Sequence, residues 1–233
     1  MGDSPYKISK IAEDFYSVDE GGVRMFLIEG SDSALLIDCG FGTGELDKFI
    51  SSVTDKKVTV VITHSDGDHT GGLKYFAEAY MHPADFASFR ERNPQHPAKL
   101  AEIWEGDVFK AGRYSFEAIH IPGHTPGSIV LYDRKNKILI SGDSIQQGPI
   151  FMFGSDRNTD ALIASLKKLK MLDLDIDIIC PSHNAVPLDG GYIDLVLEGA
   201  ELLRQGKLEA KEAPERFGGM CSEYAYKEVS FYY

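Results

Sequence analysis

Four potential metal ligands occur within six residues of this sequence, in the stretch His64-Ser-Asp66-Gly-Asp68-His69. They directly follow the apolar, β-branched run 58–62, which predicts a strand buried on both faces. The ligands would then stand at the carboxyl end of that strand, where α/β folds build their sites. Because residues i and i+2 of an extended segment point the same way, His64 and Asp66 can share one metal ion. Asp68 and His69 are adjacent and point in different directions, so they can serve a second ion. A plain polar loop between strand and helix is the alternative.

Three later positions repeat the arrangement of an apolar strand followed by one polar ligand. His124 stands in the turn Pro122-Gly-His-Thr-Pro-Gly127, which has two prolines and two glycines to aim one side chain. Asp143 and His183 follow the apolar segments 138–140 and 178–180. Alone, each residue has an ordinary alternative: a loop histidine for His124 and His183, and a helix or turn cap for Asp143. Their joint occurrence favours a metal site.

Turn signals divide the rest of the chain into short strands and helices. We expect strands at 6–11, 14–19, 23–29, 33–37, 80–82 and 177–180, hairpins of 107–111 with 114–121 and of 128–132 with 137–141, and a last strand within 224–233. We expect helices at 42–53, 70–78, 83–92, 160–172 and 192–205. Strand-rich halves that are each followed by helices predict an α+β fold. In it, two sheets pack face to face with helices outside, as a four-layer αββα sandwich that forms one domain over residues 1–233.

Charge and composition exclude several classes of partner. The net charge of −12, from 36 acidic and 24 basic residues, argues against a nucleic-acid surface, which needs clustered Lys and Arg. No apolar run approaches the roughly 18 to 20 residues of a membrane span. The N-terminal residues show no apolar core of a secretion signal, and the three cysteines have no metal-like spacing. We therefore expect a cytoplasmic protein with reduced thiols. The oligomeric state stays open.

In this set and order, the ligands resemble the signature of the metallo-β-lactamase superfamily of hydrolases. That signature is His-x-His-x-Asp-His, then a histidine after Pro-Gly, an aspartate after Gly and a late histidine. The resemblance runs from about residue 14 to residue 190, and Asp38 in Leu35-Leu-Ile-Asp-Cys-Gly40 matches an early buried aspartate of the family. It implies the αββα sandwich with a two-metal site on one edge. Carried over position by position, it gives one ion to His64, Asp66 and His124 and the other to Asp68, His69 and His183, with Asp143 bridging them.

Asp66 departs from the signature, which has histidine at this position. A carboxylate can still bind zinc, but it is a harder ligand than imidazole and shifts preference toward iron or manganese. We expect two divalent ions, with zinc first and iron or manganese as alternatives. A spectator Asp66 beside a weak site is the other possibility. Asp38 is expected to anchor a ligand from behind, or simply to cap its strand.

The resemblance is nearest to glyoxalase-II-like and lactonase-like members of the family. It implies hydrolysis of a small ester-like substrate, a thioester, lactone or carboxylic ester, by a hydroxide generated at the metals. Asp68 would act as a catalytic residue that orients water or passes a proton, and residues 146–153 would line one apolar wall of the cleft. A di-iron protein that reduces oxygen or nitric oxide is the alternative, and it would need a separate electron donor. A metal-binding protein without turnover is a third.

Overall fold

Strand β3 (Val23–Glu29) sends its successive side chains into two different cores. Met25 and Leu27 pack toward the helices on one side of the sheet, whereas Phe26 and Ile28 pack toward a second sheet. Because side chains alternate in direction along a strand, a strand that is apolar throughout is covered on both faces. The side chains of β4 and β5 divide between the same two cores. The alternating direction of side chains along these strands therefore places one layer on each face of the sheet.

The computed structural model describes residues 4–233, without the side chain at position 216. Residues 1–3 lie outside the described residues. They are the first part of the N-terminal segment in which we expect no secretion signal. The first sheet has the strand order β1-β2-β3-β4-β5-β6-β7, antiparallel as far as β4 and parallel from there. Its other strands are β1 (Tyr6–Ala12), β2 (Phe15–Glu20), β4 (Ser33–Ile37), β5 (Lys57–Val61), β6 (Glu78–Met81) and β7 (Lys99–Glu102).

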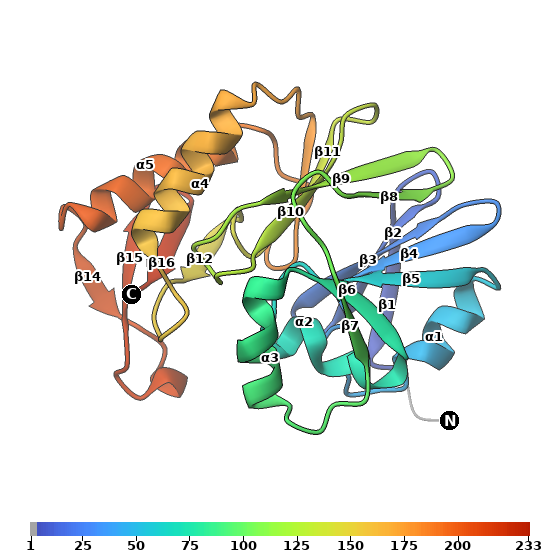
Figure 1. Cartoon of the computed structure of the whole chain (residues 1–233). Coiled ribbons are helices and arrows are strands. Elements are labelled where there is room, and N and C mark those ends of the chain that lie inside the picture. The colour runs from blue at the N-terminus through green and yellow to red at the C-terminus, as the bar shows by residue number, and fades with distance from the viewer. Residues whose placement is uncertain (1–3) are drawn as a thin grey trace.

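Short helices cover the outer face of this sheet (Figure 1). Leu46 and Ile50 of α1, Leu73 and Phe89 are buried with Leu36 in one hydrophobic cluster. The helices are α1 (Leu46–Val53), α2 (Gly67–Thr70), the 3₁₀ turns η1 (Gly71–Tyr75) and η2 (Pro83–Asp85), and α3 (Phe86–Arg92).

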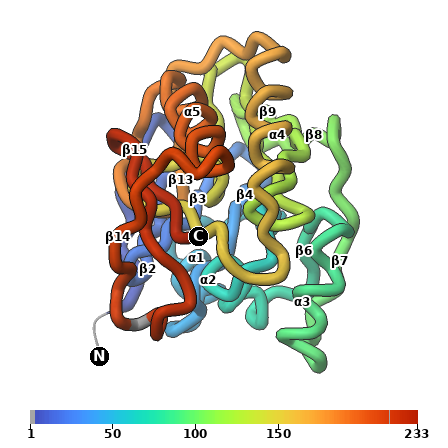
Figure 2. The backbone as a smooth tube through the Cα atoms, turned by 90° about the vertical axis from the view of Figure 1, so that its left-hand side faces the viewer, coloured from blue at the N-terminus to red at the C-terminus, as the bar shows by residue number. Residues whose placement is uncertain are grey.

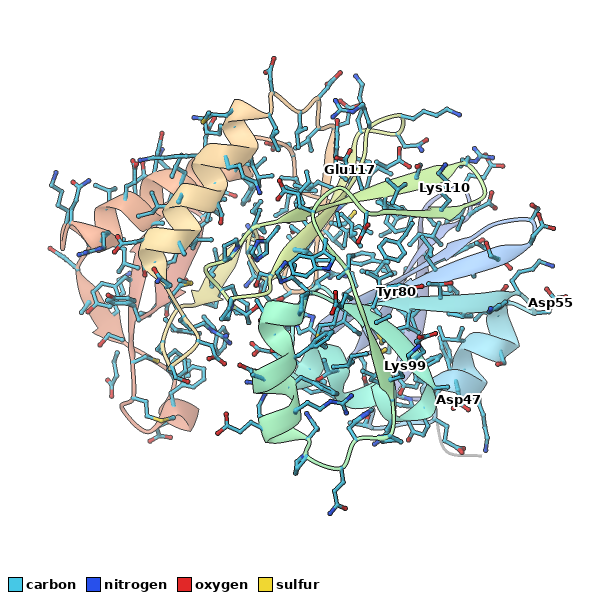
Figure 3. All side chains as sticks on the ribbon, in the orientation of Figure 1. Asp47, Asp55, Tyr80, Lys99, Lys110 and Glu117 are labelled. Carbon is cyan, nitrogen blue, oxygen red and sulfur yellow. The ribbon has the colours of Figure 1, made fainter. Side chains whose placement is uncertain are left out.

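The second sheet has the order β13-β11-β10-β9-β8 and faces the first. Figure 3 shows Tyr80 of β6 between the two sheets, where its ring lies 5.0 Å from that of Phe109 on β8. Ile129 and Leu131 of β10 share this inner core with β3, while Val130 and Tyr132 point the other way, toward α4 and α5. The strands are β8 (Val108–Ala111), β9 (Tyr114–His120), β10 (Ile129–Asp133), β11 (Ile138–Gly142) and β13 (Ile178–Pro181).

A third sheet, with the order β12-β16-β15-β14, lies beside α5 (Figure 2). Ile150 of β12 and Phe231 of β16 share a core with Leu162 of α4 and Val196 of α5. The elements are β12 (Gly148–Phe151), β14 (Ala210–Glu212), β15 (Ser222–Tyr226), β16 (Val229–Tyr232), η3 (Glu215–Phe217), α4 (Thr159–Met171) and α5 (Tyr192–Arg204).

The predicted αββα sandwich is confirmed, and several elements differ locally. Where a helix was expected at 70–78, the α-helical turn α2 ends at Thr70, the 3₁₀ turn η1 follows, and residues 78–81 belong to β6. The helix expected at 42–53 begins at Leu46, and the strand β7 was not expected. The single strand expected in the tail is the antiparallel pair β15–β16. The third sheet was not expected at all. Among the described residues, no helix combines the length and the apolar character that crossing a bilayer requires.

Candidate metal centre and substrate cleft

The loop between β5 and η1 brings the first four candidate ligands together. His64 and His69 are buried, whereas the side chains of Asp66 and Asp68 remain 20% and 25% exposed. The imidazoles therefore form the floor of the site and the two carboxylates stand at its rim. A Cβ atom on Gly72 would lie 2.3 Å from the carbonyl oxygen of Cys39, so glycine allows this loop to lie against the end of β4.

Asp38 organises the loop from behind. It is fully buried at the end of β4, with a left-handed φ of 64°. Its Oδ1 accepts a hydrogen bond from the backbone N of Thr63 at 2.7 Å, and its Oδ2 accepts one from Thr63 Oγ1 at 2.8 Å. The same Oδ2 lies 2.8 Å from His69 Nδ1. The structure thus places Asp38 against a candidate ligand, where it can fix the direction of the ring.

All four candidate histidine ligands have a partner at Nδ1. His124 Nδ1 lies 3.0 Å from the carbonyl oxygen of Phe151, and His183 Nδ1 lies 2.7 Å from that of Gly22. His64 Nδ1 lies 3.0 Å from Thr63 Oγ1, whose own proton goes to Asp38. Because these oxygens accept hydrogen bonds, each Nδ1 carries a proton, and a neutral ring of this tautomer offers its Nε2 lone pair. This is the tautomer that a metal ligand needs.

Asp143 and His183 arrive from the ends of neighbouring strands in the second sheet. Gly142, the last residue of β11, has a φ of 53°, and a Cβ there would lie 2.9 Å from Thr63 Oγ1. Glycine therefore lets Asp143 approach the loop of the first sheet. The backbone N of Ser182 donates to the oxygen of Gly142 at 3.1 Å, which fixes His183 beside Asp143.

Asp85 supports the candidate site and was missed by the sequence analysis. Its carboxylate is fully buried and accepts hydrogen bonds from Ser65 N at 2.8 Å, Thr125 Oγ1 at 2.8 Å and Gly127 N at 2.6 Å. Asp85 therefore ties the loop of His64 to the turn of His124. No sequence pattern singles it out, because it follows neither an apolar strand nor another ligand.

The structure brings all seven predicted ligand positions into one cluster, which we describe as two groups. The first group is His64, Asp66 and His124, and the second group is Asp68, His69 and His183; Asp143 lies between them. Ligand atoms of His64, His124 and Asp143 lie within 4.8 Å of one another, and so do those of the second group. Their role as ligands remains a prediction.

The donor atoms fit a divalent ion. His69 Nε2 and Asp143 Oδ1 are buried and 3.3 Å apart, yet neither makes a hydrogen bond within the described residues. His64 Nε2 and His124 Nε2, both expected to be unprotonated, face each other at 3.2 Å. Two lone pairs turned toward each other repel unless a cation or a proton lies between them. Imidazole and carboxylate are ligands that zinc, iron and manganese all accept.

Charge differs sharply between the two groups. Burial lowers the pKa of His69, but the carboxylates of Asp143, Asp38 and Asp68 outweigh it and raise this pKa well above its ordinary value. Burial also lowers the pKa of His183, but Asp143 and Asp68 raise it to about 10. Burial and then the charge of Arg157 lower the pKa of His124. Carboxylates thus attract protons onto the imidazoles of the second group but not onto His124.

Two arginines approach Asp66. Arg157 Nη2 forms an ion pair and hydrogen bond with Asp66 Oδ2, and Arg92 Nη2 lies 3.8 Å from Asp66 Oδ1. Asp66 Oδ2 also faces His124 Nε2 at 3.2 Å and His64 Nε2 at 3.6 Å. The sequence analysis did not anticipate either arginine.

An open cleft of about 610 Å³ lies over the cluster. The cleft is lined on the side of the cluster by Asp66, Asp68, Asp143, His124 and His183. One wall is apolar and comes from three distant segments: Phe41, Pro149 and Phe151, and Phe217. The wall predicted at 146–153 is therefore present, and the C-terminal segment adds to it. Polar lining comes from Gln146 and Asn184.

The remaining histidines lie outside the cluster. His82 and His120 stack on each other with ring centroids 3.9 Å apart, and His96 packs against Phe89.

Comparison with known proteins gives a consistent result. The model of the metallo-beta-lactamase superfamily matches residues 18–183. The acyl-coenzyme A thioesterase MBLAC2 of Gallus gallus is 29% identical over 215 residues, which cover 74% of this chain and 76% of that protein. The hydroxyacylglutathione hydrolase GloC of Haemophilus influenzae is 28% identical over 167 residues, which cover 63% of this chain and 77% of that protein. A metallo-beta-lactamase from Pontibacter korlensis shares the fold, with a TM-score of 0.70 at 17% identity over 84% of this chain and 99% of that one.

Proposed function

This chain belongs to the metallo-β-lactamase superfamily, and on that premise we propose that it is a metal-dependent thioesterase with a preference for apolar acyl groups. It is a hydrolase, because its relatives include an acyl-coenzyme A thioesterase and a hydroxyacylglutathione hydrolase. One observation carries the proposal: imidazoles and carboxylates line the same cleft as an aromatic wall.

Two divalent ions would be held by the first and second groups, with Asp143 between them. When bound, such ions supply a Lewis acid for the substrate carbonyl and lower the pKa of water toward about 7. Zinc is the expected ion, and the harder Asp66 oxygen leaves iron or manganese as alternatives.

Asp68 is the carboxylate best placed to handle the proton. Its side chain is 25% exposed, compared with 6% for Asp143, and both line the cleft. Burial raises the pKa of Asp68, but the charge of His69 and the hydrogen bond from His183 lower it by more, so that the pKa of Asp68 lies below its ordinary value; in the loaded site the positive charge would come from the ions in place of the ring protons. Asp68 is therefore ionised at neutral pH and can accept a proton from the attacking water.

The reaction adds water across the thioester. A C–O bond forms between the water oxygen and the acyl carbon, and the C–S bond breaks with its electron pair on sulfur. Asp68 takes one proton from the attacking water and returns it to the leaving thiolate, so a carboxylic acid and a thiol are released and the acid ionises in solution. Nothing is oxidised or reduced.

The aromatic wall supports an apolar acyl group rather than a short hydroxyacyl group. Phe151 packs with Phe217 at 5.4 Å and with Tyr232 at 5.1 Å between ring centroids, so that the wall is one continuous cluster. Burying each additional methylene against it is worth about 0.8 kcal/mol, which corresponds to a three- to fourfold gain in kcat/KM per carbon until the wall is filled.

The test is release of free thiol from acyl-coenzyme A esters of increasing length by the zinc-loaded protein. S-lactoylglutathione, a γ-lactone and a chromogenic β-lactam serve as competing substrate classes. We expect kcat/KM to rise with acyl length and to exceed that for the other three. Phe151→Ala should flatten the length dependence, whereas Leu172→Ala, on the exposed end of α4, should not. A flat profile, or faster turnover of the lactone or lactam, would overturn the proposal.

The redox alternative depends on Asp66 as a ligand for iron. The hydrolase relatives favour the thioesterase. Elemental analysis of purified protein separates the two readings, since stoichiometric iron with a visible absorption band and no thiol release would support the redox function instead.

A further inference from the structure

Asp66 occupies the position where the family signature has histidine, and a guanidinium lies against it. We propose that Arg157 is a positioning residue that holds Asp66 Oδ2 toward the first group and balances its charge, so that Asp66 and Arg157 together replace one neutral imidazole. This inference rests on the proposed metal centre but not on the proposed substrate.

The contacts converge on one carboxylate oxygen. Asp66 Oδ2 accepts the hydrogen bond of Arg157 Nη2 and also faces His124 Nε2 at 3.2 Å and His64 Nε2 at 3.6 Å. A carboxylate oxygen has two lone pairs. One is used by Arg157, and the other remains for an ion between the two imidazoles. Rotation of the carboxylate away from the histidines would break the contact with Arg157.

Arg157 is held by the segment that carries it. Its side chain is only 12% exposed. The backbone N of the next residue, Asn158, donates to the oxygen of Gly123 at 2.8 Å, and the side chain of Asn158 caps α4 through Ala161 N at 2.9 Å. The segment that carries Arg157 is therefore fixed beside His124.

Charge gives the pair its second function. Replacing histidine by aspartate adds one negative charge to the first group, and Arg157 returns one positive charge at hydrogen-bond distance. Arg92 contributes less, because it is 41% exposed and its Nη2 donates to Ser65 O at 2.7 Å and Ser65 Oγ at 2.8 Å. An isolated Asp66→His change would leave Arg157 facing an ion and a neutral ring.

The test is a double-mutant cycle read out by metal binding without substrate. The four proteins are wild type, Arg157→Met, Asp66→His and the double variant. Each is stripped of metal and titrated with zinc against a chromophoric chelator, with calorimetry for stoichiometry. We expect two binding events and assign the weaker one to the first group, where Arg157 offsets part of the negative charge. Either single change should weaken this event by about 10- to 100-fold, as for other residues that support a ligand. The double variant should return to within about threefold of wild type.

Strictly additive losses in the double variant would overturn the proposal, and so would tighter binding in Arg157→Met, which would show that Arg157 competes with the ion. Arg204→Met is the matched control: it removes an exposed arginine 2.7 Å from Asp160, near the start of α4, and should bind zinc as wild type does. If Arg157→Met does not fold, Arg157→Gln completes the same cycle. If the double variant regains zinc affinity but the protein hydrolyses no thioester, only the proposed substrate is refuted. If the protein hydrolyses thioesters but the losses of zinc affinity are additive, only the positioning role of Arg157 is refuted.

Discussion

The two groups of the cluster contain the same kinds of ligand but lie in opposite electrostatic surroundings. Around the first group, Arg157 and Arg92 offset the charge of Asp66, and the pKa of His124 is lowered by burial and by Arg157. Around the second group, carboxylates dominate over burial and raise the pKa of His183 to about 10. Two groups with the same kinds of ligand therefore present different net charge to a cation. The second group carries an excess of negative charge, and we expect it to bind the first ion.

The largest effect is expected from the second group itself. Asp68→Asn should lower the rate of thioester hydrolysis by at least about 100-fold, because it removes both a candidate ligand and a general base. The fold should survive, since this side chain lies at the rim of the cleft. Steady-state kinetics and thermal unfolding of the zinc-loaded variant measure the two effects. Near-normal turnover would show that Asp68 has no such role.

The next effect tests whether the two groups share one support. Asp38 contacts His69 directly and His64 through Thr63. In Asp38→Asn, the amide can donate to His69 Nδ1, which would move the ring proton to Nε2. We expect zinc affinity to fall by about 10- to 100-fold for both binding events. Weakening of one event alone would mean that the groups are supported separately.

A third measurement addresses the order of binding. Titration of metal-free protein with zinc should give two binding events whose affinities differ by about tenfold or more. The reason is that each unit charge close to a bound ion changes its affinity by several-fold, even when solvent screens the interaction. His183→Ala should remove the tighter event and His124→Ala the weaker one. Equal affinities in wild type, or the reverse assignment, would contradict the electrostatic comparison.

The smallest effect is expected at the stacked pair His82–His120, outside both groups. Burial, and then the charge of His120, lower the pKa of His82 to about 4. A histidine whose folded pKa lies below the unfolded value of about 6.5 favours folding above that pH, and this contribution is lost as the pH falls toward 4. Between pH 7 and pH 5.5 the loss is about 1 kcal/mol. Denaturant unfolding of zinc-loaded wild type and His82→Asn should differ in pH dependence by that amount, and parallel curves would show that His82 does not titrate in this way.

The sequence predicted the elements whose pattern is local. The strands β3 and β4 have the expected bounds, because turn residues mark both ends of a regular apolar run. The third sheet could not be predicted in this way. Its β12 pairs in parallel with β16, some 80 residues later, and β14 is exposed throughout, without an apolar face.

The same distinction holds for the site. The candidate ligands and Asp38 follow apolar strands, so their convergence could be inferred from the sequence. Arg157, Arg92 and Asp85 act on those ligands from a loop, a helix and a turn that carry no ligand. Their proximity follows from the packing of the layers, which no spacing in the sequence records.

The hydrogen bond that orients His124 links the candidate metal site to the third sheet. The carbonyl of Phe151 that accepts from His124 Nδ1 belongs to β12, the edge strand of the third sheet, whose ladder partner is β16. Local unfolding of the β15–β16 hairpin would release β12, and with it both the aromatic wall and the orientation of that imidazole. A hairpin that contributes no ligand thus shares in holding a candidate ligand in place, and hydrogen exchange at the amides of β16 measures how often that hold is released.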